Sequence, residues 1–172
     1  MPTVGCSGTP NPANLCPGGD EVQCCQGGHA VISGLSTIQS AHAWQIAAAV
    51  RAKGLDTQAC VIAIATGITE ATLHNYANTG VDASLNYVYD ALGEDHDSVG
   101  IFQQRVAYYP DLDADMDPTQ SAEAFLDKMV NVDGWESADP GEVAQEVQGS
   151  AYPTRYDDNV PQARTICSAM GF

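Results

Sequence analysis

One glutamate lies inside a long stretch of low polarity. The stretch runs from Gln58 to Asn78, and its unbroken apolar run from Cys60 to Ala65 predicts a helix that is buried on all sides. Burial disfavours the charged form of a carboxyl, so we expect a raised pKa for Glu70, as a general acid requires. Gly67, one turn earlier, leaves room for another group to approach. Alternatively, Glu70 is a structural residue that reaches solvent or forms a salt bridge.

A second set of reactive side chains lies between Gly93 and Gly100. This loop reads Glu-Asp-His-Asp-Ser-Val between its glycines, so it brings three carboxylates and an imidazole close together. Such a run is often only a solvated loop, and neighbouring side chains on an extended chain point alternately outward, which disfavours one shared metal ion. Glycoside hydrolysis, by contrast, uses one protonated carboxyl and usually one carboxylate. We therefore expect an aspartate of this loop to act with Glu70.

Helices must position these residues, and most helix starts carry capping signals. A capping box at Ser36 to Gln39 predicts a helix that ends at Lys53-Gly54. An aspartate followed by proline, which favours the first helical position, marks two later starts. The central helix should end at Asn78-Thr79-Gly80. The expected starts are Ser36, Asp56, Asp117, Asp139 and Val160, and the last helix runs to Met170.

Three other segments are expected to be irregular. We expect Leu85 to Tyr89 to form a short strand or an extended loop, and Asp111 to Asp117 to form a solvated loop. Ser150 to Asp158 reads as a loop as well. The prediction is thus a mainly α domain over residues 35–172, preceded by a Cys-, Gly- and Pro-rich segment, residues 1–34, that is held by disulfides and packed on the domain.

Charge and cysteine content restrict the class of protein. A net charge of −16 over 172 residues disfavours nucleic acid and anionic membranes as partners, and no segment is long and apolar enough to span a membrane. We expect a mature, secreted, monomeric protein, with Met1 added for expression. Six cysteines favour three disulfides; a Cys60–Cys167 bridge is plausible, other pairings stay open, and the spacings fit a zinc site poorly.

Three segments carry a resemblance to a known family. A glutamate on a buried helix, followed by a polar loop and Gly100-Ile101-Phe102-Gln103-Gln104, resembles the goose-type lysozyme and soluble lytic transglycosylase superfamily. Within that superfamily, the chain resembles the fungal secreted muramidases. The matching segments are Glu70 to Leu73, Asp95 to Arg105 and Gln148 to Pro153, within about residues 36–170.

The resemblance implies a lysozyme-like helical domain that cleaves the β-1,4 bond between N-acetylmuramic acid and N-acetylglucosamine of bacterial peptidoglycan. Glu70 corresponds to the catalytic acid. For the second carboxylate, counting back from Gly100 gives Glu94, whereas Asp95 and Asp97 are the other choices; we prefer Asp95. Further substrate-binding residues would be Asp97, Ser98, Gln103, Gln104 and Tyr152.

Structural roles compete with some of these assignments. Gln103 and Gln104 could instead brace the loop, and Tyr152 could be a half-buried aromatic residue. We expect Trp44 and Trp135 to pack in the core, and His74 to point away from Glu70 or to stay neutral, because a charged imidazole would lower the pKa of the acid.

Several functional alternatives remain at this point. One is a lytic transglycosylase, in which a hydroxyl of the muramic acid attacks and an anhydro sugar forms. Another is a non-catalytic module that binds cell wall or chitin, and a third is an acidic protein that binds a basic partner. The preferred hypothesis is a cell-wall-degrading, antimicrobial hydrolase that needs no metal or cofactor and is most active at acidic pH.

Overall fold

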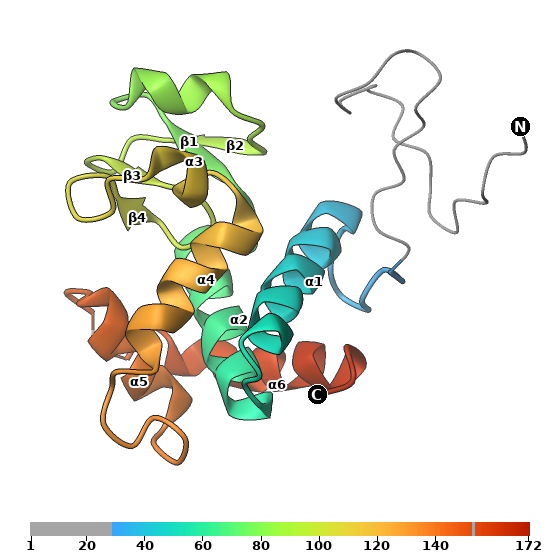
Figure 1. Cartoon of the computed structure of the whole chain (residues 1–172). Coiled ribbons are helices and arrows are strands. Elements are labelled where there is room, and N and C mark those ends of the chain that lie inside the picture. Colours follow the sequence, from blue (N-terminus) through green and yellow to red (C-terminus); the bar gives the residue numbers. More distant parts are fainter. Residues whose placement is uncertain (1–28, 153) are drawn as a thin grey trace, which may run out of the picture.

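Helices form most of the described chain. The computed structural model describes residues 29–152 and 154–172, so the predictions about residues 1–28 and four of the six cysteines lie outside it. The described residues contain six α-helices, which confirms the mainly α class (Figure 1). These are α1 (Thr37–Ala52), α2 (Thr57–Ala71), α3 (Leu112–Asp115), α4 (Pro118–Met129), α5 (Pro140–Gln148) and α6 (Val160–Ala169).

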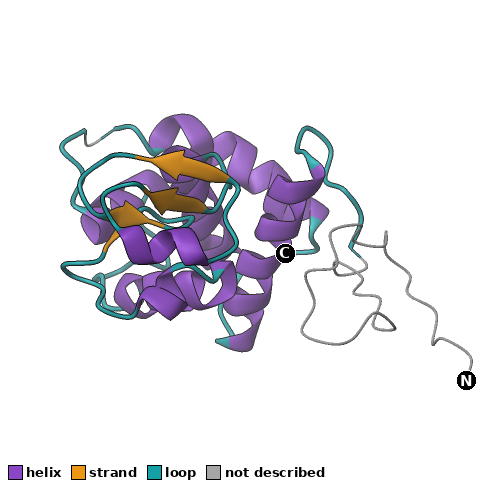
Figure 2. Ribbon diagram, turned by 90° about the horizontal axis from the view of Figure 1, so that it is seen from above, coloured by secondary structure: helices purple, strands orange, loops and turns teal. Residues whose placement is uncertain are grey.

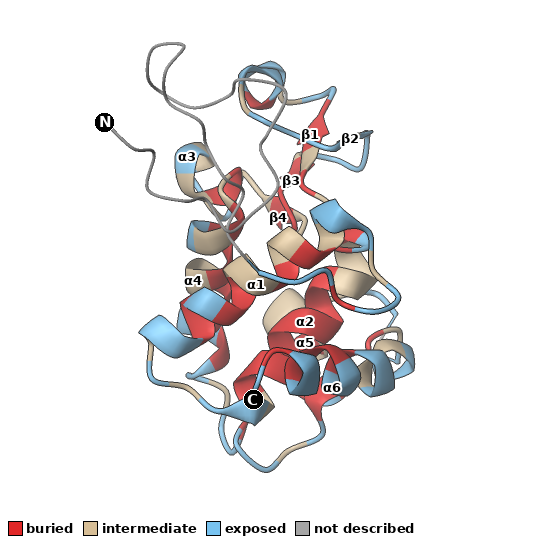
Figure 3. Cartoon of the chain, turned by 90° about the vertical axis from the view of Figure 1, so that its right-hand side faces the viewer, coloured by how far each residue is buried: buried red, intermediate tan, exposed pale blue. Residues whose placement is uncertain are grey.

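Helix α2 lies at the centre, in contact with α1, α4, α5 and α6. Every residue from Ala59 to Thr66 is fully buried, which confirms the predicted helix without a solvent-facing side (Figure 3). Asp56 caps its start by accepting hydrogen bonds from the amides of Gln58 and Ala59. A helix with apolar side chains on every side is stable here because the neighbouring helices shield each side from water.

The predicted end of this helix was wrong. Helix α2 ends at Ala71, because Thr72 and Leu73 adopt the left-handed conformation with φ of 48° and 57°. The amide of Leu73 then donates to the carbonyl of Gly67 at 3.0 Å, and its side chain folds back over the helix. A Cβ added at Gly67 would lie 3.1 Å from Leu73 Cδ2 and 3.5 Å from Ile46 Cδ1. The groups that approach the helix at Gly67 are therefore core side chains.

Short strands follow α2 and gather on one side of the helices (Figure 2). Strand β1 (Tyr76–Asn78) pairs in parallel with β2 (Ala91–Gly93), and β3 (Ser98–Val99) pairs antiparallel with β4 (Gln104–Arg105). The segment Leu85 to Tyr89 is not a strand: its first two residues belong to a 3₁₀ helix, η1 (Asp82–Asn86), and the remainder is irregular.

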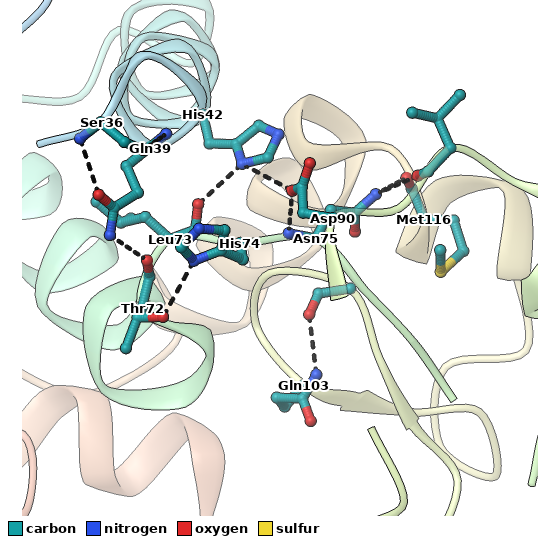
Figure 4. Close-up of polar contacts among 12 residues, drawn as sticks. Ser36, Gln39, His42, Thr72, Leu73, His74, Asn75, Asp90, Gln103 and Met116 are labelled. Carbon is teal, nitrogen blue, oxygen red and sulfur yellow. Dashed lines mark hydrogen bonds and ion pairs between the residues drawn. The ribbon is translucent and has the colours of Figure 1, made fainter. Parts of the chain in front are cut away.

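Hydrogen bonds attach the strands to the helices just beyond α2 (Figure 4). The Asn75 side chain donates to the carbonyls of Val88 and Met116 at 2.9 and 2.8 Å, and its amide donates to Asp90 Oδ2 at 2.7 Å. His42 Nδ1, from α1, lies 2.8 Å from the Leu73 carbonyl and 3.5 Å from Asp90. The left-handed turn and the strand that follows it are thus held to α1.

The capping predictions for the other helices are confirmed. Ser36 and Gln39 form the full capping box of α1, and Asp117 and Asp139 cap α4 and α5, each with proline in the first turn. Within the described part of the predicted loop Ser150 to Asp158, regular structure is limited to the first residues of a short 3₁₀ helix, η2 (Asp157–Asn159), ahead of α6.

The prediction of a solvated loop at Asp111 to Asp117 was wrong. Asp111 caps the short helix α3, and Asp115 at the end of α3 is only 1% exposed. Burial is the main cause that raises the pKa of Asp115 to about 7. Among the described residues, its Oδ2 atom has no hydrogen-bond partner. The Gly100 turn packs directly on this helix, because a Cβ added at Gly100 would lie 2.2 Å from the Asp115 carbonyl oxygen.

The Cys60–Cys167 disulfide joins α2 to α6, which confirms that pairing. Trp135 is a core residue, and Trp44 packs partly buried against the core, stacks on His29 and donates to the Ala30 carbonyl, as expected for packing residues. No helix in residues 29–152 and 154–172 is long and apolar enough to cross a membrane.

Candidate active site

Glu70 lies in the last turn of α2, where the buried helix reaches the surface. Its side chain is 11% exposed, and burial is the largest influence on the carboxyl. The net effect is a raised pKa, although Tyr156, Arg155 and Gln148 act in the opposite direction. A carboxyl of this kind holds its proton to higher pH than an exposed glutamate and remains close to solvent.

The partners of Glu70 come from the segment between α5 and α6. The buried Tyr156 hydroxyl donates a hydrogen bond to Glu70 Oε1, and this bond together with burial raises the pKa of Tyr156. Arg155 Nη1 lies 3.6 Å from Glu70 Oε2, while its Nη2 donates to the Thr69 carbonyl at 3.0 Å. Asn159 also donates to the Thr69 hydroxyl at 2.8 Å. These contacts fix the carboxyl in one orientation.

Sequence reasoning missed Tyr156 and Arg155, because it treated their segment as a loop. One signal could have found them. Arg155 is one of only six Lys and Arg residues in a chain of net charge −16, and it lies beside an aromatic residue. A rare cation in an acidic chain is a candidate partner for a functional carboxylate.

The three loop carboxylates lie in different environments. Asp95 has a side chain that is 78% exposed, with Oδ1 2.7 Å from His96 Nδ1. Its negative charge is one of the influences that raise the pKa of Glu70, so it lies within electrostatic reach of the buried acid. Glu94 is exposed and is not among those influences. Of these two carboxylates, Asp95 is thus the one whose charge acts on Glu70.

Asp97 has a different role from its neighbour. Its carboxylate accepts hydrogen bonds from Arg105 Nε and from the Ala107 amide, the latter at 2.8 Å. The Arg105 bond is the main cause that lowers the pKa of Asp97. Asp97 therefore closes the loop that carries β3 and β4.

The two glutamines differ in exposure. Gln104 is 2% exposed, donates to the Ser121 carbonyl at 3.2 Å and accepts from the Ser121 hydroxyl at 2.6 Å. This geometry matches the loop-bracing alternative. Gln103 is half-buried, has a left-handed backbone with φ of 49°, and donates to the Gly100 carbonyl at 3.0 Å. Ser98 is buried in β3, and its carbonyl accepts from the Asn78 side chain.

A pocket of about 320 Å³ lies beside these residues. Its walls come from β4, the turn after it, α4 and the end of α5. Gln148 lines the pocket, donates to the Phe102 carbonyl at 2.8 Å and is one of the side chains that lower the pKa of Glu70, so the pocket lies close to the acid. The pocket is lined by Gln103, Gln104, Arg105, Tyr108, Tyr109, Lys128, Val147, Gln148 and Gly149.

Two further predicted residues lie outside the pocket wall. Tyr152 is 73% exposed and does not line the pocket. His74 Nδ1 lies 3.1 Å from the Thr72 hydroxyl, within the turn that ends α2 (Figure 4). Among the described residues, no group of three His, Cys, Asp or Glu side chains is placed to hold a metal ion.

Taken together, the site contains a buried carboxyl whose raised pKa favours its protonated form, an exposed carboxylate within electrostatic reach of it, and a pocket lined by Gln148, one of the side chains that act on the buried carboxyl. Such an arrangement can donate a proton on one side of a bound molecule and stabilise positive charge on the other. Comparison of the sequence with protein-family models and with curated proteins finds no significant match.

Proposed function

We propose that this chain is a muramidase, which hydrolyses the β-1,4 bond between N-acetylmuramic acid and N-acetylglucosamine in peptidoglycan. The observation that carries the proposal is the environment of Glu70: burial raises its pKa while the carboxyl stays next to an open pocket. A general acid of a glycosidase needs this combination, since it must hold a proton and reach the glycosidic oxygen.

In the proposed reaction, Glu70 gives its proton to the oxygen that leaves with the N-acetylglucosamine. The bond between this oxygen and the anomeric carbon breaks, and positive charge develops on the muramic acid ring. Asp95 stabilises that charge or holds the attacking water, whose hydroxyl group joins the anomeric carbon and whose other proton passes to the carboxylate. Exchange with solvent then restores both side chains.

Tyr156 and Arg155 are positioning residues in this scheme. The Tyr156 hydroxyl occupies Glu70 Oε1, which leaves Oε2 as the oxygen that can carry the proton. Arg155 lies 3.6 Å from Oε2, and it stabilises the carboxylate that remains after the proton has left.

Hydrolysis is favoured over the transglycosylase reaction by one feature. A lytic transglycosylase needs no activated water, because the 6-hydroxyl of the muramic acid attacks. The exposed Asp95 carboxylate is suited to hold a water molecule near Glu70. The buried disulfide between α2 and α6 suits an oxidising compartment, so we also propose that the protein acts outside the cell.

The test is mass spectrometry of soluble fragments after digestion of purified peptidoglycan. We expect reducing muropeptides from the wild type, and about 100-fold or greater loss of the cleavage rate in Glu70→Gln. Glu136→Gln makes the same change at an exposed site and serves as the matched control. Asp95→Asn should be impaired far more than Glu94→Gln if Asp95 is the second carboxylate.

Other products would change the assignment. Fragments lighter by one water, with an anhydro end, would make the protein a transglycosylase with the same acid. Binding of peptidoglycan without any cleavage by the wild type would make it a wall-binding module and would overturn the enzyme proposal.

A further inference from the structure

Positive charge is scarce in this protein, yet two cations line one pocket. The chain has six Lys and Arg residues against 22 Asp and Glu residues. Arg105 and Lys128 both contribute to the pocket beside Gln148. They come from β4 and α4, so the fold brings them together from positions 23 residues apart in the sequence.

Each cation lies over a tyrosine of the same pocket. The Lys128 ammonium is 3.5 Å from the centroid of the Tyr109 ring, and the Arg105 guanidinium is 5.5 Å from that of Tyr108. Cation–π contacts orient a positive group and leave its outer hydrogen atoms free to donate. The pocket thus presents two oriented cations on an aromatic wall.

Both cations retain free donors. Arg105 bonds Asp97 through Nε, and within residues 29–152 and 154–172 its terminal nitrogens have no carboxylate partner. Lys128 forms no salt bridge with any residue in the same part of the chain. Lys128 acts to lower the pKa of Asp115, but that carboxyl is buried in α3 and does not line the pocket. A ligand with negative charge would satisfy these donors best.

We infer that this pocket binds an anionic group carried by the glycan strand, either a carboxylate of the peptide branch on muramic acid or a phosphate of an attached wall polymer. The inference rests on the proposed function, because it names the part of the substrate that lies beside the bond to be cleaved. Gln148 lines the pocket and is one of the side chains that lower the pKa of Glu70, so an anion held there belongs to a sugar next to the acid.

A neutral sugar is the competing occupant, since tyrosine rings also pack against sugars. A neutral sugar would not need two cations, however. An anionic substituent would accept hydrogen bonds from both of them and neutralise their charge. The pocket would then make the enzyme selective for substituted peptidoglycan over bare glycan strands.

The experiment measures substrate preference with three forms of one peptidoglycan. These are the intact material, strands from which an amidase has removed the peptides, and material from which hydrofluoric acid has removed wall phosphate. We expect the wild type to have about tenfold higher kcat/KM on the form that carries the recognised anion. In Lys128→Gln this preference should shrink to less than about threefold.

Two control variants separate the pocket from general charge effects. Lys53→Gln removes the same charge from the end of α1, where Lys53 pairs with Asp127, and should keep the wild-type preference. Lys128→Arg should restore most of it. If Lys128→Gln loses the preference for material with peptides over material without them, the bound anion is a carboxylate. If it loses the preference for material with wall phosphate over material without it, the bound anion is a phosphate. An unchanged preference in Lys128→Gln, or an equal loss in Lys53→Gln, overturns the inference.

A binding measurement keeps the inference separate from the proposed function. Calorimetric titration of Glu70→Gln with muramyl peptide, the unsubstituted disaccharide and a phosphorylated muramyl sugar requires no cleavage. We expect about tenfold tighter binding of one anionic ligand, and loss of that difference when Lys128→Gln is added. If the wild type cleaves nothing but this difference is found, the proposed reaction fails and the anion site stands. Equal binding of all three ligands means that the pocket takes a neutral sugar.

Discussion

Opposing influences set the proton affinity of Glu70. Burial raises its pKa, whereas the Tyr156 hydroxyl bond is the largest influence that lowers it, followed by the positive charge of Arg155. Tyr156 is fully buried, so its hydrogen bond to Glu70 lies in the protein interior, where hydrogen bonds are stronger than in water. Tyr156 therefore adjusts the acid as well as orienting it.

Removal of that hydroxyl should move the pH profile. In Tyr156→Phe the pKa of Glu70 rises further, because a donor that favours the carboxylate is lost. A general acid loses activity as the pH rises through its pKa, so the alkaline limb of kcat/KM should move to higher pH. The measurement is kcat/KM on soluble muropeptide chains from pH 4 to 9.

Tyr89→Phe is the matched control, since Tyr89 is an exposed tyrosine before β2 and should leave the limb in place. The buried hydroxyl contributes to folding as well, so about 1 kcal/mol of the free energy of unfolding should be lost in Tyr156→Phe alone. A limb that stays or moves to lower pH would show that Tyr156 does not act on the acid.

The burial of Glu70 could be predicted from the sequence, whereas its contact with Tyr156 could not. The apolar surroundings of Glu70 can be read from its neighbours in the chain, and burial is indeed the largest influence on it. Tyr156 lies 86 residues further along and meets Glu70 only because α2, η2 and α6 pack together. No local pattern encodes such a contact, and so the tyrosine escaped prediction.

Two glycines show how the elements are fitted together around α2. Gly67 lies within the helix against the side chains of Leu73 and Ile46, whereas Gly100 lies in the turn between β3 and β4 with φ of +75°. At Gly100 the nearest obstacle is a backbone carbonyl of α3, which cannot rotate away as a side chain can. The two positions therefore differ in what an added methyl group would displace.

Gly100→Ala should be strongly destabilising and Gly67→Ala nearly neutral. At Gly100 the methyl group meets a carbonyl oxygen at 2.2 Å in a left-handed backbone, which should cost about 3 kcal/mol of the free energy of unfolding. At Gly67 the gain in helix propensity, up to about 1 kcal/mol, offsets a tight contact with Leu73.

Urea denaturation of both variants, followed by circular dichroism, compares the same substitution in two settings. Equal losses of stability in the two variants would contradict the difference in packing described here. A large loss at Gly67 alone would mean that the left-handed turn at Leu73 cannot adjust to an added methyl group.

Helix starts were predictable and the end of α2 was not, for a physical reason. Ser36, Asp56, Asp117 and Asp139 cap helices through bonds to amides only two or three residues away, so a short sequence window contains the signal. The end of α2 depends on Thr72 and Leu73 in a conformation that favours glycine. Burial of the Leu73 side chain compensates for it, and burial depends on the whole core.

At the scale of the whole molecule, one covalent link spans most of the described chain. Cys60 and Cys167 are 107 residues apart, and both are fully buried between α2 and α6. A crosslink over so long a segment restricts the unfolded chain strongly, because it removes the entropy of a large open loop. The pairing was predictable only as one plausible choice, since six cysteines allow many others.

The double substitution Cys60→Ala with Cys167→Ala should lower the free energy of unfolding by about 2–5 kcal/mol. Replacing both residues avoids a free thiol and leaves the remaining cysteines unchanged. Thermal and urea unfolding of the variant and the wild type, both without reductant, measure the difference. An unchanged midpoint would mean that helix packing alone holds α2 and α6 together.

The buried Asp115 links the folding equilibrium to proton uptake. Its pKa is raised to about 7 in the folded protein, whereas an aspartate in an unfolded chain titrates near about 3.9. Between these pH values the native state holds a proton that the unfolded state has released. Asp115 therefore makes its whole contribution to the free energy of unfolding below the unfolded-state pKa. This contribution is lost as the pH rises from that pKa to the folded-state pKa, by at most about 1.4 kcal/mol per pH unit.

The half-buried Asp97 acts in the opposite sense, because its lowered pKa gives stability that is lost only in stronger acid. Above the pH at which Asp97 takes up its proton, a fall in pH protonates both Asp115 and Glu70, because both have raised pKa values in the folded protein. Mild acid therefore protonates Glu70, the proposed catalyst, and also raises the free energy of unfolding through Asp115, on whose helix the Gly100 turn rests. The pH of the surroundings thus controls both how active and how long-lived the protein is.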